Sequence, residues 1–146
     1  EAKFILFGVD DHPGVAAEIF GALADAGVNV DMIVQASSKS AGRQNIVFTT
    51  TERDAARARQ VLEAHKQTIG YERLDVARDV AKVSVIGIGM RSHAGVAKTM
   101  FEALASKGIN IQVISTSEIK ISVLIDASYT ELAVRALHTA YGLDGD

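Results

Sequence analysis

Two short segments carry the residues of this 146-residue sequence that are best suited to bind a small molecule. The first is DDHPGVAA, residues 10–17, and the second is RSHAGVAK, residues 91–98. Each places a glycine at the start of an expected helix, where the first backbone N–H groups have no intrahelical acceptor and can bind an anion. Small side chains after the glycine leave the approach open. Both segments therefore predict a carboxylate-binding turn.

Asp11 adds a second feature to the first of these turns. Its carboxylate could accept hydrogen bonds from an ammonium group beside a bound carboxylate, and the two receptors together describe a site for an α-amino acid. A simpler interpretation is that Asp11 caps the helix and Gly14 only avoids backbone strain. The residues alone leave both interpretations open.

The other polar residues predict no catalytic site and no metal site. His12 and His93 occupy equivalent places, but no Asp, Glu or His cluster accompanies either at ligand spacing. The segment GIGM, residues 87–90, lacks the Lys-Ser/Thr ending of a phosphate loop. The chain has no cysteine, which excludes thiolate chemistry. We therefore expect neither a metal nor a cofactor.

Composition limits the choice of partners. The chain has 15 Lys and Arg against 18 Asp and Glu, a net charge of −3, whereas nucleic-acid-binding surfaces are usually basic. An RNA-binding module remains an alternative, with bases stacked on Phe4, Phe7 and Phe48. No apolar run approaches the roughly 20 residues that cross a bilayer. We expect a cytoplasmic protein that contacts neither nucleic acid nor membrane.

The two segments belong to an internal repeat. Residues 10–32 align without a gap to a second copy 81 positions later, because Gly14 matches Gly95 (95 − 14). The repeat predicts two domains, residues 1–78 and 79–146. The identical pairs include His12/His93, Val15/Val96, Phe20/Phe101, Leu23/Leu104, Gly27/Gly108 and Asn29/Asn110.

The hydrophobic pattern predicts the same elements in each domain. In the first, a strand is followed by a helix that ends at Gly27, two strands, a helix that opens with the capping box Thr51–Asp54, and a last strand. The second copy repeats the order, with a capping box at Ser128–Glu131, but stops before its fourth strand. The fold class is therefore α+β, two ferredoxin-like βαββαβ units with antiparallel sheets and helices on one face. The missing strand is either trimmed away or supplied by another segment.

Several expected strands, such as FILF and ISVLI, are apolar on both faces. An antiparallel sheet with helices on one side usually exposes a polar opposite face. We therefore expect a dimer, with sheets packed together or joined edge to edge.

These motifs resemble a known family. The pattern D-x-P-G-x-A at residues 11–16, within tandem βαββαβ units, is similar to ACT domains, and the run NIQVISTSEIKISVLI resembles the regulatory region, or beta subunit, of aspartate kinase. The resemblance implies a part that is not an enzyme on its own and that acts on a catalytic subunit phosphorylating aspartate. It also implies homodimers in which effector amino acids bind between an ACT domain of one chain and the other domain of its partner. A third alternative is an ACT-type sensor of another enzyme or of transcription.

Carried onto this sequence, the resemblance implies two effector pockets. The first would use Asp11, Gly14, Val15, Ala16 and Gln35, with Asn110 and Ile111 of the other domain. The second would use Ser92, Gly95, Val96, Ala97 and Ser117, with Asn29, Val30 and Asp31 of the other domain.

The pockets are not equivalent, since Arg91 and Ser92 replace the two acids of the first turn. Feedback inhibition by threonine, lysine or both is expected. Threonine is favoured because its hydroxyl suits Gln35, whereas a lysine tail needs a further acid such as Asp31 or Glu118.

Overall fold

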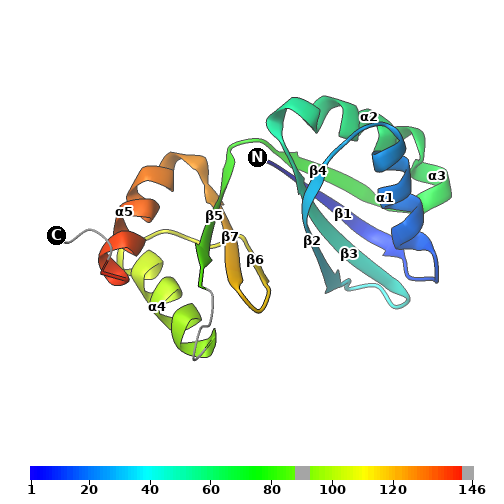
Figure 1. Cartoon of the computed structure of the whole chain (residues 1–146). Coiled ribbons are helices and arrows are strands. Elements are labelled where there is room, and N and C mark those ends of the chain that lie inside the picture. The colour runs from blue at the N-terminus through cyan, green and yellow to red at the C-terminus, as the bar shows by residue number, and fades with distance from the viewer. Residues whose placement is uncertain (88–92, 143–146) are drawn as a thin grey trace. The chain divides into compact units, whose positions relative to one another are not determined.

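The chain folds into two compact units, Glu1–Arg78 and Asp79–Asp146. The computed structural model describes residues 1–87 and 93–142. In each unit, helices cover one face of an antiparallel sheet (Figure 1). In the part of the chain that the structure describes, none of the helices has the length and apolar character that a membrane span requires.

The first unit is a complete βαββαβ fold with a four-stranded sheet of order β2-β3-β1-β4. Neighbouring strands in this sheet are antiparallel. Its elements are β1 Ala2–Asp10, α1 Val15–Asp25, β2 Val30–Ser37, β3 Arg43–Thr50, the 3-10 turn η1 Glu52–Asp54, α2 Ala55–Ala64, α3 Lys66–Ile69 and β4 Arg73–Ala77.

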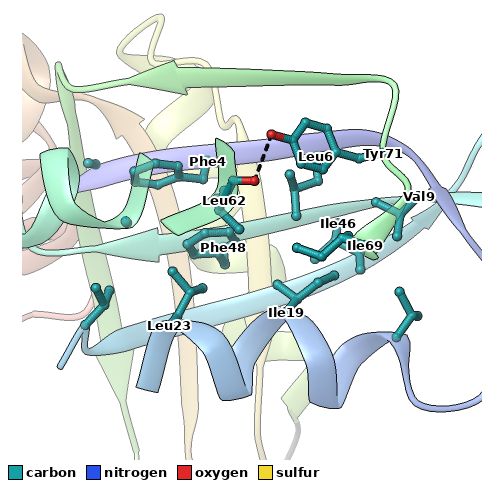
Figure 2. Close-up of a cluster of buried hydrophobic side chains, with 14 of the residues drawn as sticks. Phe4, Leu6, Val9, Ile19, Leu23, Ile46, Phe48, Leu62, Ile69 and Tyr71 are labelled. Carbon is teal, nitrogen blue, oxygen red and sulfur yellow. Dashed lines mark hydrogen bonds between the residues drawn. The ribbon is translucent and has the colours of Figure 1, made fainter. Parts of the chain in front are cut away.

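The core of this unit forms because β1 and β3 alternate large apolar residues toward the helices. Phe4 and Phe48 face each other across the two strands and stack at 5.0 Å, while Phe20 of α1 meets Phe48 edge-on. Figure 2 shows Ile19 and Leu23 of α1 pointing from the helix into this layer. Phe4 and Phe48 are fully buried. Phe4 and Phe48 therefore cannot stack RNA bases, and the half-buried Phe7 ring is covered by the guanidinium of Arg73.

A bulge at the end of β1 directs the chain toward α1. The pairing of β1 with β3 shifts by one residue between Leu6 and Val9, and Gly8 has a φ of 63°. The extra residue lets both Leu6 and Val9 join the core. The Gly8 N–H donates to Asn45 Oδ1 at 3.0 Å, so the bulge leaves this buried donor satisfied.

The second unit has a three-stranded sheet of order β5-β7-β6. Strand β5 takes the place of β1, and in the described residues no strand occupies the place of β4 beside it. Helix α4 packs with α5 over a core that includes Met100, Leu104, Ile121, Val123 and Leu137. The elements are β5 Val80–Ile86, α4 His93–Ser106, β6 Val113–Thr116, β7 Lys120–Asp126, the 3-10 turn η2 Ala127–Tyr129 and α5 Thr130–Ala140.

Two helix caps differ in detail from the sequence prediction. Thr51 Oγ1 accepts the Asp54 N–H at 3.3 Å as expected, but the Asp54 carboxylate turns toward Asn29 instead of completing the capping box. Before α5 the capping residue is Asp126, whose carboxylate accepts the backbone N–H and the hydroxyl of Ser128. These two bonds hold the pKa of Asp126 below its ordinary value. The expected Ser128–Glu131 capping box is therefore wrong, since Asp126 caps η2 and α5 itself has no side-chain cap.

Candidate functional site

The loop between β1 and α1 leaves the first turn of the helix open. Gly14 is the N-cap, with a φ of 92°, and α1 begins at Val15, so Pro13 precedes the helix instead of opening it. The first full helical bond runs from Glu18 N–H to the Gly14 carbonyl at 3.0 Å. No side chain caps the helix, and the exposed residues Ala16 and Ala17 present small side chains there. Their N–H groups therefore face outward as potential anion donors.

Asp11 and Asp10 have different environments although they are neighbours. Asp10 pairs with Arg43 at 3.2 Å, and Arg43 also donates to the Gly8 and Gly70 carbonyls. Asp11 is exposed, and within residues 1–87 and 93–142 its one hydrogen bond is from its backbone N–H to the Gly42 carbonyl. The interpretation that Asp11 caps α1 is therefore wrong. Its carboxylate remains available to a cation.

Strand β2 and the residue before it carry exposed polar side chains. Asn29, Asp31 and Gln35 are all exposed, while Met32 is buried among them. The pairing of β2 with β3 shifts by one residue between Val30 and Ile33, so Gln35, opposite Ile46, does not share a face with Asp31. Ile33, on the face of Gln35, is exposed as well and adds an apolar residue to this edge of the sheet.

Gln44 is a residue of this region that the sequence reasoning missed. It lies on β3 between its Cα partners Val9 of β1 and Ser37 of β2, and only 6% of its surface is exposed. Its Oε1 accepts a hydrogen bond from Gln35 Nε2. The signal in the sequence was a glutamine two and four residues before the core residues Ile46 and Phe48, in the period of a buried strand face.

We call the open turn at Gly14–Ala17, together with Asp11, Gln35 and Gln44, the first site. Val9, near the end of β1, pairs with Gln44, which is bonded to Gln35. Asp11 follows Val9 by two residues, so the loop that carries Asp11 starts beside the two glutamines. Val15 is buried in the core, so only its backbone can serve a ligand. Gly14 has nothing within 4 Å of the place of a Cβ, which leaves space above the turn.

Asn29, Val30 and Asp31, assigned to the second pocket, follow α1 at the start of β2. The Asn29 N–H donates to Asp54 Oδ2 at 3.1 Å, and Arg57 pairs with the same carboxylate at 3.6 Å. Asp54 is buried, so this link fixes where the strand begins. Val30 is half-buried and Asp31 exposed.

The second unit carries the remaining residues of the two implied pockets. Gly95 is exposed and Val96 and Ala97 are half-buried, whereas Ser92 lies outside the described residues. Tyr141 Oη donates to the Val96 carbonyl at 2.6 Å, and burial raises the pKa of this phenol. Asn110 and Ser117 are exposed and Ile111 is half-buried.

His12 offers no metal site. It is exposed, and its Nδ1 lies 3.0 Å from the Pro13 carbonyl. Across residues 1–87 and 93–142, His, Asp and Glu side chains nowhere gather in a group of three that could hold an ion.

Comparison with known proteins identifies the fold and the class. Models of the ACT domain match residues 3–70 and residues 83–141. The protein therefore consists of two ACT domains in tandem.

Relatives of known identity narrow the class to one family. The aspartokinase of Helicobacter pylori is 50% identical over 147 residues, and that of Pseudomonas aeruginosa is 51% identical over 144 residues. Each match covers 99% of this chain, which spans about a third (35%) of the relative's length. The ligand-free regulatory subunit of aspartate kinase from Thermus thermophilus is 44% identical with a TM-score of 0.86, over 96% of this chain and 91% of that one. A chain from the crystal structure of aspartokinase alpha and beta subunits is 48% identical, with a TM-score of 0.88, over 97% of this chain and 93% of that one.

The chain belongs to the regulatory ACT regions of aspartate kinase. It is the regulatory part and not the catalytic part of such an enzyme.

Proposed function

We propose that this chain mediates feedback inhibition of aspartate kinase by binding threonine at the first site. The observation that carries the proposal is that uncapped N–H groups at the start of α1 lie near the carboxylate of Asp11, which has no partner in the described part of the chain. A free amino acid carries a carboxylate for the former and an ammonium for the latter. The backbone donors and the helix dipole both favour the negative group at this end of the helix.

The assembly proposed for this function is a homodimer. Asn110 and Ile111 of the partner's second ACT domain would close the first site over the bound amino acid. The reciprocal pocket would use Gly95, Val96, Ala97, Ser117 and Ser92 with Asn29, Val30 and Asp31. We expect the first site to bind more tightly, because the second turn has Ser92 where the first has Asp11.

Inhibition follows if the ligand prefers one arrangement of the dimer. A ligand shifts an equilibrium only by its different affinities for the two states, so threonine must bind the arrangement that holds the catalytic part inactive. The catalytic partner would be an aspartate kinase chain or domain, and both would act in the cytoplasm. Lysine is the competing effector, since Asp31 or Glu118 could receive its terminal ammonium.

Calorimetric titration of the intact protein with threonine and with lysine tests the proposal. We expect heat from threonine, and about tenfold or greater weakening in Asp11→Asn, because a hydrogen bond to a charged group contributes about 1.5–3 kcal/mol. Asp25→Asn is the matched control, since it makes the same change at an exposed position at the C-terminal end of α1, away from the open first turn. Heat from neither amino acid would overturn the proposal, and heat from lysine alone would reassign the effector.

A further inference from the structure

Gln44 lies where the sheet meets the entrance of α1. Side chains on one strand alternate between faces, so Gln44 shares the face of Ile46, which belongs to the core covered by the helices. Its neighbours across the sheet are Val9, just before the loop to α1, and Ser37, at the end of β2. With 6% of its surface exposed, Gln44 forms part of the floor beneath the exposed side chain of Gln35.

The bond between the two glutamines fixes which atom Gln35 presents to its surroundings. Gln35 Nε2 donates to Gln44 Oε1. A side-chain amide carries its carbonyl oxygen and its NH₂ group on opposite sides of one carbon, so the Gln35 carbonyl turns away from Gln44. A free glutamine could rotate and present either group. Bound to Gln44, it presents an acceptor.

The Nε2 group of Gln44 can still donate hydrogen bonds. Its N–H groups have no acceptor among residues 1–87 and 93–142, although the side chain is buried. Buried donors of this kind are usually bonded to protein, water or ligand. A ligand atom that reaches the pair can therefore donate to Gln35 Oε1 and accept from Gln44 Nε2.

We propose that Gln44 is a specificity-determining residue of the first site, which positions Gln35 to recognise a hydroxyl on the effector side chain. The inference rests on the proposed amino-acid binding at this site. A hydroxyl both donates and accepts, whereas the ammonium of lysine only donates and a methyl group does neither. A site that is built to hydrogen-bond a hydroxyl rejects an analogue of the same shape that lacks it, because its polar groups are then unpaired. Threonine and valine are such a pair.

The test measures the ratio of threonine to valine affinity by calorimetry of the intact protein. We expect wild type to bind threonine about tenfold or more tightly than valine, the effect of one to two hydrogen bonds. In Gln44→Met, which keeps the length of the side chain, threonine binding should weaken until the ratio approaches one, while valine binding stays within about twofold. Gln60→Met is the control, because Gln60 is an exposed residue of α2.

Gln35→Met gives a second and independent readout, since this side chain is exposed and its loss does not disturb the core. The single variants and the double variant should all show the same low ratio, because the two residues act as one unit. Equal weakening of threonine and valine in Gln44→Met would indicate a structural role only and would overturn the inference. So would an unchanged ratio, and in both cases the proposed function would stand. Wild type that binds neither threonine nor valine would overturn the inference together with threonine as the proposed effector.

Discussion

Asp54 illustrates how a single buried carboxylate connects elements that are distant in the sequence. It follows the Thr51 cap before α2, accepts the Asn29 N–H at the start of β2 and pairs with Arg57. Burial makes these partners important, since a buried charge without hydrogen bonds is strongly unfavourable. The sequence predicted Asp54 as one half of a capping box, and its second role depends on how α1 returns the chain to β2.

Replacing Asp54 with alanine should lower the free energy of unfolding by about 1.5–3 kcal/mol, because the Asn29 N–H and the Arg57 guanidinium lose a charged acceptor. Asp54→Asn should cost less, since its amide oxygen still accepts from Asn29. Urea denaturation with fluorescence or circular dichroism measures both. Glu52→Ala, an exposed acid in the same turn, is the control. A loss as large in Glu52→Ala as in Asp54→Ala would contradict this role.

Two glycines of α1 and its N-cap differ in backbone conformation, one left-handed and one helical. Gly14 caps the helix with a φ of 92°, a region in which residues with a Cβ are strained, and Gly21 lies inside the helix. Apart from its chain neighbours and the backbone of its own helix, neither has an atom of the described residues within 4 Å of the place where a Cβ would be. Backbone conformation alone therefore decides what a substitution does at either position.

Gly14→Ala should lower the free energy of unfolding by about 1–2 kcal/mol, the cost of left-handed backbone in a residue with a Cβ. Gly21→Ala should raise it by about 0.5–1 kcal/mol, because alanine restricts the unfolded chain and favours the helix. Chemical denaturation of the two variants beside wild type measures the pair. If both variants changed the free energy of unfolding in the same direction, backbone conformation would not be what decides the effect of these substitutions.

At the scale of the whole molecule, the repeat places similar apolar residues on two sheet edges. Ile33 on β2 and Ile114 on β6 are 81 positions apart, the offset of the repeat, and are 52% and 45% exposed. Both strands are at the ends of their sheets. Exposed apolar residues on an unpaired edge favour association with another chain. This is the structural support for the proposed homodimer.

The double variant Ile33→Glu, Ile114→Glu should weaken dimer formation by at least about tenfold, because association would bury two charges without partners. Sedimentation equilibrium over a range of protein concentrations measures the dissociation constant. Val134→Glu is the control, because it adds the same charge at an exposed apolar residue of helix α5. A dimer of unchanged strength in the double variant would place the interface elsewhere.

The sequence by itself determined the repeat, the α+β class, the order of the elements and the residues around Gly14, because hydrophobic period and glycine placement act locally along the chain. Only the tertiary structure decided the rest. In the folded chain Arg43 pairs with Asp10 and not with Asp11. The Asp54 carboxylate accepts a hydrogen bond from Asn29, and the Gln44 side chain accepts one from Gln35. These outcomes depend on strand register and on the bulge at Gly8, which bring together residues far apart in the sequence.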